Sequence, residues 1–362
     1  MRSRPLVLLL PLIFACENAE PFGPAAAESA TFRSEASAPR LGLMTQNMYV
    51  GTDVDALILA LASPDPADDF PGLLSALAML QATDFASRAA AMADAIARER
   101  PHAVGLQEVS VIHVDLTSVG VPLVHVDFLA GLQAALAAKG LDYVVAGANL
   151  NFTAAPMPGI SLSDSDVLLV DADRVTVDAA AGHTFASNLG AVAPGVTLTR
   201  GYVTADVTID GRGYRIVTAH PEADFGVSLA ALRGAQAMEL AAAVAGRAPA
   251  VVMGDLNDVP GSPLYDVLTG AGFVDVWPEL RPGVDGFTDK HPYDLGNAHP
   301  TFTARKDYIF VRGVEGPSGS LQGSVELLGD TPAERVDGAF GSIWPSDHAG
   351  VIANLLLPGR RN

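Results

Sequence analysis

The sequence predicts an α/β protein in which mixed β-sheets are covered by helices and packed as layers of one domain. Short apolar runs typical of strands alternate with longer Ala-rich helical segments. Some strands are joined through helices, which allows parallel pairing, and others through tight turns, which give antiparallel pairing. The 362 residues, 49% of them apolar, suffice to bury one large α/β core or two modest ones.

Strands are expected wherever apolar and β-branched residues form short runs between polar or turn residues. These runs are residues 41–47, 102–109, 142–147, 166–171, 201–210, 212–220, 248–257, 306–312 and 348–357. Gly211 separates two of them and predicts a hairpin.

Helices are expected at residues 84–100, 125–140, 228–246 and 262–272. Pro101 ends the first, and Gly140 closes the second. Residues 182–195 contain several small and turn-forming residues, and they are expected to form a flexible connection.

The segment at residues 52–83 contains two apolar helical stretches that are interrupted by an acidic, Pro-containing break. Its helices are expected to pack on the core. The alternative is that their apolar face forms a lid or touches lipid.

The N-terminus has the pattern of an export signal. Arg2 and Arg4 precede an apolar run at residues 6–15, and Cys16, the only cysteine of the chain, follows it. The run is too short to span a bilayer but suits a cleaved signal, and its end resembles a bacterial lipobox. We expect residues 1–15 to be removed and Cys16 to be lipidated, with ordinary secretion as the alternative.

The expected mature protein is an exported chain of the cell envelope, anchored to the membrane or secreted. Residues 16–40 are rich in Ala, Ser, Glu and Pro and are expected to be a flexible tether, with the folded domain at residues 41–358. With a single cysteine, no disulfide forms within the chain.

The chain is strongly acidic, with a formal charge of −19 that becomes −21 when Arg2 and Arg4 are removed with the signal. It contains only three lysines, Lys139, Lys290 and Lys306, and no basic run. Proteins that bind nucleic acid neutralise phosphates with Lys and Arg, so the acidity disfavours DNA or RNA as substrate without excluding them. An acidic surface is also common in secreted bacterial proteins.

Polar side chains stand at the ends of the expected strands. Asn47 and Glu108 follow two of them, and Asp255 and Asn257 follow a third. Glu108 is placed as the principal ligand of Mg²⁺, with Mn²⁺ as the alternative, because both cations prefer hard oxygen ligands. Asp255 is expected to orient or deprotonate water, and Asn257 to donate hydrogen bonds to a phosphoryl oxygen. The competing interpretation is that these residues form turns or cap the next helix.

Asp307 and His348 are the expected dyad. A carboxylate bound to one imidazole nitrogen fixes the tautomer and leaves the other nitrogen facing the reaction, as a base or a phosphate ligand. Asp347 is expected to contact the metal directly or through water. No Cys/His cluster with zinc spacing occurs in the sequence.

Six strings, "TQNMYVG", "GLQEV", "TAHPEAD", "GDLND", "KDYIF" and "SDH", occur in an order that resembles the endonuclease/exonuclease/phosphatase superfamily from residue 41 to residue 357. The resemblance implies a four-layer α/β/β/α sandwich of deoxyribonuclease I type. It also implies a metal-dependent phosphoric ester hydrolase, in which Asn47 helps to hold the metal or the phosphate.

By the same resemblance, His220 stabilises or protonates the leaving oxygen. The string "HPEAD" departs from the usual pattern after this histidine. Asp166 is the candidate partner of His220, and Asp164 or Glu222 would serve equally well. The other histidines carry no metal-type spacing: surface positions are expected for His102, His113, His125 and His183, and loop solvation or a place in the substrate cleft for His291 and His299.

The preferred function is hydrolysis of small or lipid-head-group phosphoesters by a monomeric protein. The anchor, the acidity and the apolar segment at residues 52–83 favour it. The alternatives are an extracellular endonuclease or deoxyribonuclease, and a binding protein without catalysis. The complete set of polar strings disfavours the last.

Overall fold

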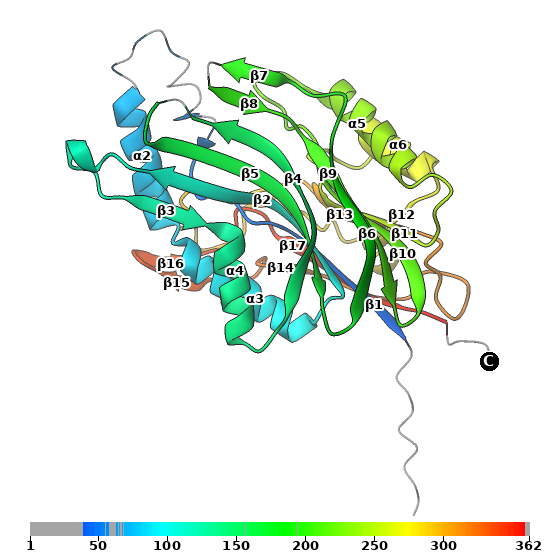
Figure 1. Cartoon of the computed structure of the whole chain (residues 1–362). Helices are drawn as coiled ribbons and strands as arrows, with labels where there is room; N and C mark the ends of the chain where they lie inside the picture. The colour runs from blue at the N-terminus through cyan, green and yellow to red at the C-terminus, as the bar shows by residue number, and fades with distance from the viewer. Residues whose placement is uncertain are drawn as a thin grey trace, which may run out of the picture. The chain divides into compact units, whose positions relative to one another are not determined.

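The computed structural model describes residues 39–54, 56–57, 63, 65, 67, 69–155, 157–193 and 195–358. Two β-sheets pack face to face, and helices cover their outer faces (Figure 1). The predicted four-layer α/β/β/α sandwich with mixed sheets is confirmed. The expected signal, Cys16 and most of the expected tether lie outside the described residues.

The first sheet has the strand order β14-β17-β1-β2-β5-β4-β8-β7, and β3 pairs with β2. Strands β1 and β2 are parallel, and the other pairs are antiparallel. The bounds are β1 Arg40–Asn47, β2 Ala103–Val114, β3 Val124–Asp127, β4 Tyr143–Ala154, β5 Ile160–Asp171, β7 Gly190–Ala193, β8 Val196–Leu198, β14 Gly323–Leu328 and β17 Gly350–Leu356.

The second sheet has the order β12-β13-β11-β10-β9-β6, in which β10 and β11 are parallel. The bounds are β6 Val175–Thr184, β9 Gly201–Ile209, β10 Arg212–His220, β11 Ala250–Asp255, β12 Val274–Asp275 and β13 Asp307–Arg312. The hairpin expected at Gly211 joins β9 and β10. A small separate pair is formed by β15 Val336–Gly338 and β16 Gly341–Ile343.

Helices α3 Phe85–Glu99 and α4 Phe128–Ala138 cover the outer face of the first sheet, and α5 Ala230–Ala243 and α6 Pro263–Gly270 cover that of the second. Side-chain oxygens of Asp84, Asp127 and Ser262 accept hydrogen bonds from the first turns of α3, α4 and α6. The described residues also include the helical segments α2 Asp69–Ala82, α7 Val276–Leu280, η1 Thr117–Val119 and η2 Pro332–Glu334.

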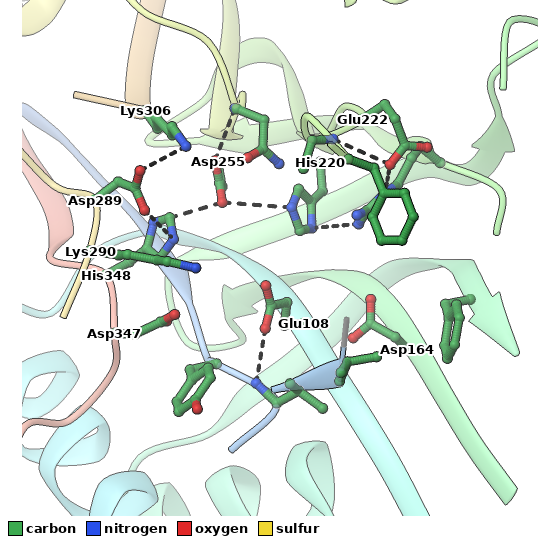
Figure 2. A pocket seen from close by; sticks show the side chains of 18 of the residues that line it. Glu108, Asp164, His220, Glu222, Asp255, Asp289, Lys290, Lys306, Asp347 and His348 are labelled. Atoms are coloured by element: carbon green, nitrogen blue, oxygen red, sulfur yellow. Dashed lines mark hydrogen bonds and ion pairs between the residues drawn. The ribbon is translucent and has the colours of Figure 1, made fainter. Parts of the chain in front are cut away.

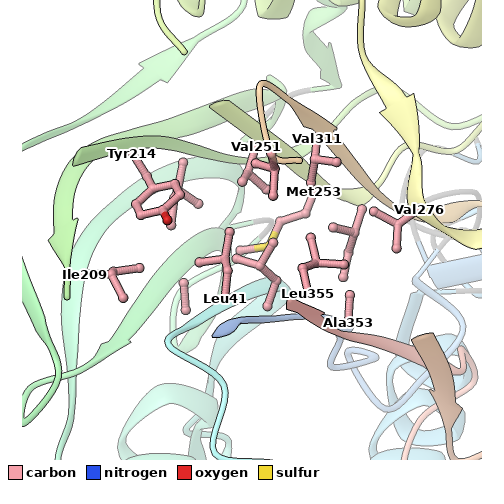
Figure 3. Packing of buried hydrophobic residues seen from close by; sticks show 14 of the residues in the cluster. Leu41, Ile209, Tyr214, Val251, Met253, Val276, Val311, Ala353 and Leu355 are labelled. Carbon is pink, nitrogen blue, oxygen red and sulfur yellow. The ribbon is translucent and has the colours of Figure 1, made fainter. Parts of the chain in front are cut away.

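The main core lies between the two sheets. Leu41, Val251, Met253 and Leu355 meet there with residues of neighbouring strands (Figure 3). Side chains alternate between the two faces of a strand, so every second residue of the central strands enters this layer. The alternation also decides which residues at the strand ends point between the sheets.

Several sequence predictions of element bounds were wrong. Residues 124–127 form β3, so the helix expected from residue 125 begins at Phe128, where Asp127 caps it. The flexible connection expected at residues 182–195 contains the end of β6 and all of β7. Strand β6 was not predicted because its sequence "VTVDAAAGHT" has little apolar alternation. The strand is instead stabilised by its antiparallel pairing with β9.

The second apolar stretch of residues 52–83 forms α2, whose Leu73 and Leu80 are buried, as expected for packing on the core. Most of the first stretch lies outside the described residues. In the described part of the chain, every helix is too short or too polar to cross a membrane.

Candidate active site

Strand alternation brings polar residues from both sheets to one edge of the main core. Val251 and Met253 of β11 face the core, and Asp255 is the next residue on that face. Asp166 within β5 and Asp307 at the start of β13 each lie two residues from a core residue of their strand. Asn47 and His220, at the ends of β1 and β10, lie two such steps beyond Leu43 and Ile216. Each of these five side chains is at most 2% exposed. The candidate site is therefore built between the sheets, by the strands that form the core.

Glu108 reaches this site through an irregularity of β2. Regular alternation would turn its side chain to the outer face, where Leu106 packs. The register against β5 shifts between Leu106 and Val109, and Glu108 has a left-handed φ of 54°. Its Oε2 accepts a hydrogen bond from the Val50 backbone N at 2.9 Å. A β-bulge thus aims the expected metal ligand into the cavity (Figure 2).

Asn47 joins the two sheets. Its Nδ2 donates to Glu108 Oε1 at 3.0 Å and to Asp255 Oδ2 at 3.1 Å. Its Oδ1 accepts from the Tyr49 backbone N at 2.9 Å, which fixes the orientation of the amide. Asn47 therefore holds the two carboxylates through its nitrogen, and its oxygen is already engaged by the backbone.

Asp255 stands at the centre of the candidate site. Its Oδ2 lies 3.6 Å from His220 Nε2 and 3.7 Å from His348 Nδ1, and its Oδ1 accepts from the Asn257 backbone N at 2.9 Å. Burial raises the pKa of Asp255, but His348 and His220 together have the larger, opposite effect and lower the pKa to about 2. Asp255 is thus ionised at neutral pH.

The turn after Asp255 needs two unusual backbone positions. Gly254 has a φ of 148°, and a Cβ there would lie 2.0 Å from the Ala219 carbonyl oxygen, so only glycine fits. Asn257 has a φ of 52°, and its Nδ2 donates to the Pro221 oxygen at 3.2 Å. One amide hydrogen of Asn257 remains for a substrate oxygen.

The expected dyad partners, Asp307 and His348, are in contact. Asp307 Oδ2 lies 2.8 Å from His348 Nδ1, and the Asp307 backbone N donates to Thr288 Oγ1 at 3.1 Å. Burial lowers the pKa of His348, but Asp307 and Asp255 raise it well above its usual value. The two carboxylates therefore favour the protonated form of His348.

Asp289 was missed by the sequence reasoning and stands on the other side of His348. Its Oδ1 lies 3.5 Å from His348 Nε2, and its Oδ2 lies 2.7 Å from Lys306 Nζ. The nitrogen that was expected to face the reaction thus faces a second carboxylate. Asp289 belongs to a loop rather than to a strand end, so no alternation pattern marks it.

His220 has an unexpected neighbour. Asp166 Oδ1 is 3.9 Å from His220 Nδ1, beyond hydrogen-bond distance, whereas Arg200 Nη1 is 3.2 Å from the same nitrogen. Burial and then Arg200 lower the pKa of His220 to about 4. The other two candidate partners bind elsewhere: Asp164 accepts from Ser110, and Glu222 pairs with Arg200.

The carboxylates of the cavity fit a divalent cation. Asp347 Oδ1 and Asp307 Oδ1 are buried and have no hydrogen-bond partner, and Figure 2 shows Glu108 and Asp347 directed into the same space. Burial raises the pKa of Asp347 to about 7, with His348 lowering it and Glu108 raising it. A hard cation would satisfy the unpartnered oxygens and relieve the repulsion between these two carboxylates.

A second group of side chains has ligand atoms close enough together to hold a metal ion. One ligand atom each from Asp255, Asp307 and His348 lie within 4.8 Å of one another. His348 Nδ1 is engaged by Asp307 in an ion pair, however, and a protonated imidazole offers no lone pair. The oxygen ligands Glu108 and Asp347 are the better match for the predicted Mg²⁺.

A cleft of about 550 Å³ opens at this site, and its lining includes Glu108, His220, Asp255, Asn257, Asp289, Asp347 and His348. Four basic residues lie along it: Arg200, Arg233, Lys290 and Lys306. Beyond the polar groups, the lining is largely apolar, and it includes Val50, Val54, Phe152, Leu162, Leu189, Leu198, Ala223, Phe225 and Val259. The cleft thus combines a charged end, in which carboxylates and basic residues lie together, with an apolar wall.

Arg88 supports the cleft from behind and was also missed. It is 0% exposed, and its guanidinium donates to the carbonyl oxygens of Thr83, Met48 and Tyr49. These bonds hold the loop that carries the Val50 N–H to Glu108. The signal was present in the sequence, because Arg88 lies at helical spacing between the buried Phe85 and Met92 of α3.

Two histidines differ from their expected surroundings. His102 was expected at the surface but is buried, because its Nδ1 accepts from the Gly42 backbone N at 2.9 Å. His291 is 1% exposed and stacks on Trp344 and Phe302 rather than lining the cleft. His299 is exposed, as expected for loop solvation.

These two buried histidines predict a loss of stability in weak acid. Burial, as the largest cause, lowers the pKa of both His102 and His291 to about 4, below the unfolded value of about 6.5. Between these pH values the unfolded chain binds more protons, so the free energy of unfolding falls as the pH drops from about 6.5 towards 4, by about 1–3 kcal/mol per histidine. Urea unfolding at pH 7 and pH 5 measures this loss.

His102→Asn tests the contribution of one site, since the Asn oxygen retains an acceptor for the Gly42 N–H. The variant should lose less stability than the wild type between the two pH values. The exposed His299→Asn should behave like the wild type. An unchanged pH dependence in His102→Asn would contradict the prediction.

The sequence model of the Endonuclease/Exonuclease/phosphatase family matches residues 44–348. A solved structure of a family protein from Bacteroides thetaiotaomicron has a TM-score of 0.55 at 16% identity and covers 89% of this chain and 99% of that chain. A mannosyl-6-phosphatase from Bacteroides thetaiotaomicron VPI-5482 also has a TM-score of 0.55, at 15% identity, and covers 88% of this chain and 100% of that one. At such identities the likeness shows the fold.

Among curated proteins, the 3'-5'-exoribonuclease subunit of the CCR4-Not complex from Coccidioides immitis (strain RS) is 29% identical over 137 residues. The match covers 33% of this chain and 17% of that protein. The chain therefore spans less than a fifth of the length of this relative.

Proposed function

The chain belongs to the Endonuclease/Exonuclease/phosphatase family, and we propose that it hydrolyses small or lipid-head-group phosphoesters with the help of Mg²⁺. Members of the family are metal-dependent phosphoester hydrolases, so the predicted enzyme class is confirmed. The substrate class and the identity of the metal are the proposal.

The observation that carries the proposal is the contrast between the two parts of the cleft. Its polar end holds the carboxylates and the basic residues Arg200, Lys290 and Lys306. Its wall includes Phe152 and Leu162 together with side chains of other elements, and the volume of about 550 Å³ is typical of small-molecule sites. A phosphoester bearing an apolar group would satisfy both parts.

The carboxylate, amide and imidazole side chains of the site have the following roles in this proposal. Glu108 and Asp347 would hold the cation, with Asn47 fixing Glu108. The bound cation would neutralise phosphoryl oxygens and favour attack by water. The ionised Asp255 orients the water or accepts its proton, and Asn257 donates to a phosphoryl oxygen. His220 donates from Nε2 towards the leaving oxygen, while His348 adds fixed positive charge.

A nuclease is the second candidate, and the similarity to the exoribonuclease subunit is what favours it. The net charge of −19 opposes it, because long nucleic acids need basic surface over many phosphates. Arg200, Arg233 and Lys306 of the cleft already pair with carboxylates, which leaves little free positive charge for a long nucleic acid.

A substrate panel tests the proposal with the full chain. Phosphate monoesters, choline phosphodiesters of short-chain lipids, plasmid DNA and an RNA oligonucleotide are each incubated with Mg²⁺ and with EDTA. We expect the small and lipid phosphoesters to be cleaved at least about tenfold faster in kcat/KM than nucleic acid, and EDTA to abolish cleavage. Preference for DNA or RNA would replace the proposal with the nuclease, and absence of turnover on every substrate would overturn it.

The apolar wall offers a matched variant for the same panel. Phe225 is 43% exposed, so Phe225→Ser leaves the fold intact while removing apolar contact in the cleft. Loss of about 1.5 kcal/mol of burial should raise KM for the lipid phosphoester roughly tenfold and leave the phosphate monoester unaffected. Val119→Ser is the control, because Val119 is 65% exposed and lies outside the cleft.

We further propose that the protein is exported as a monomer and anchored through lipidated Cys16. The charged and apolar pattern of residues 2–15 supports this proposal. Mass spectrometry of the mature chain tests it: a retained N-terminus or an unmodified thiol would contradict the anchor.

A further inference from the structure

Arg200 is held beside His220 by the pairing of two strands. His220 at the end of β10 pairs with Gly201 of β9, and Arg200 is the residue before Gly201. A Cβ at Gly201 would lie 2.2 Å from the backbone carbonyl oxygen of His183, so this position admits only glycine. Arg200 Nε binds Glu222 Oε1 at 3.2 Å, and the side chain of Arg200 is 13% exposed. The register and Glu222 together fix the guanidinium next to the imidazole.

We infer that Arg200 is a positioning residue that keeps neutral His220 in the tautomer with its proton on Nε2. The nearest guanidinium nitrogen, Nη1, lies 3.2 Å from His220 Nδ1. A guanidinium has donors and no acceptor, so this contact is favourable only when Nδ1 presents a lone pair. The single proton of the neutral ring then resides on Nε2.

The assignment of the proton decides what His220 does. Nε2 points towards Asp255 in the cleft, with Oδ2 at 3.6 Å (Figure 2). Carrying the proton, Nε2 donates a hydrogen bond to an oxygen of the substrate and has no lone pair with which to deprotonate water. The role of base then falls to the ionised Asp255 rather than to His220.

A carboxylate bonded to Nδ1 of His220 would favour the other tautomer. An ionised Asp166 bonded to Nδ1 would place the proton on Nδ1, but its Oδ1 is 3.9 Å away and makes no hydrogen bond. Arg200 occupies the nearer position. Glu222, one of the expected partners of His220, acts instead through Arg200.

Nuclear magnetic resonance of the full-length, ¹⁵N-labelled wild type tests the inference directly. Long-range ¹H–¹⁵N spectra distinguish the two tautomers, and the signals of His220 among the eight histidines are assigned by their loss in His220→Gln. We expect the Nε2–H tautomer at neutral pH. A proton on Nδ1 in the wild type would overturn the inference without any further variant.

Two substitutions separate positioning from mere structural support. Arg200→Leu removes the donor, and we expect a population with the proton on Nδ1 and a kcat about 10²-fold lower. Arg200→Lys keeps a donor and should restore the Nε2–H tautomer and most of kcat. Arg215→Leu, which removes a partly exposed Arg from the same strand as His220, is the matched control.

Failure of this inference can be distinguished from failure of the proposed function. The inference rests on the phosphoester hydrolase reaction of this site, but the tautomer is read without substrate or metal, so failure of the substrate panel leaves this readout intact. If Arg200→Leu kept the Nε2–H tautomer and the wild-type kcat, Arg200 would have no positioning role. If Arg200→Leu failed to fold, the wild-type spectrum would still test the inference, because a proton on Nδ1 would overturn it.

Discussion

Glu108→Gln is expected to lower kcat/KM by about 10³-fold while leaving the fold intact. The substitution removes a negative charge from the side chain that is placed to bind the cation. Stabilisation of the transition state by a bound metal amounts to several kcal/mol, and each 1.36 kcal/mol corresponds to a factor of about ten in rate. The Gln side chain also has only one oxygen for the two donors, Asn47 Nδ2 and Val50 N, that Glu108 satisfies.

Steady-state kinetics and calorimetric titration with Mg²⁺ and Mn²⁺ measure the two expected losses, of activity and of metal affinity. Glu326→Gln is the matched control, because its side chain is 57% exposed and lies outside the cleft. If Glu108→Gln kept the metal affinity and most of the activity, the cation would be held by other ligands, such as the group of Asp255 and Asp307.

The central residues of the site could be predicted from sequence because strand alternation fixes their direction. Asp255 and Asp307 each lie two residues from a core-facing residue of their strand, and Asn47 lies four residues beyond Leu43 on the same face of β1. Asp255 and Asp307 lie on the neighbouring strands β11 and β13, and Asn47 lies on β1 of the other sheet, so their convergence follows from the packing of the two sheets. The direction of Glu108 depends on a β-bulge, which the string "GLQEV" does not reveal.

The residues that were missed depend on tertiary contacts between segments far apart in sequence. Asp289 meets His348 through an isolated bridge between a loop and the start of the last strand. Arg200 faces His220 because of the register between β9 and β10, and a shift of one residue would turn it to the other face. The burial of His102 likewise depends on a hydrogen bond to Gly42, far away in the chain.

The burial of Arg88, unlike its role, could be predicted from the sequence. A lone arginine on the apolar face of an Ala-rich helix is unusual, since a buried charge needs partners. Its partners, however, are backbone carbonyl oxygens, and backbone atoms carry no sequence signal. The position was therefore predictable as buried, whereas its role in the loop at residues 48–50 was not.

Arg88→Met is expected to lower the free energy of unfolding by about 3–5 kcal/mol. Methionine fills a similar volume but donates no hydrogen bond, so the carbonyl oxygens of Thr83, Met48 and Tyr49 lose a buried donor, at about 1–3 kcal/mol for an unsatisfied group. Burial lowers the pKa of Arg88 to about 10, so the guanidinium remains charged at neutral pH.

The same substitution should also reduce activity in the molecules that remain folded, because the loop released by Arg88 presents the Val50 N–H to Glu108.

Arg98→Met in the same helix is the control for helix propensity, since the Arg98 side chain is 54% exposed and its ion pair lies at the surface. Urea unfolding of the two variants and of Arg88→Lys, which has fewer donors and should be intermediate, measures the effect. Equal stabilities of Arg88→Met and Arg98→Met would mean that the carbonyl oxygens find other donors and that Arg88 does not hold the loop.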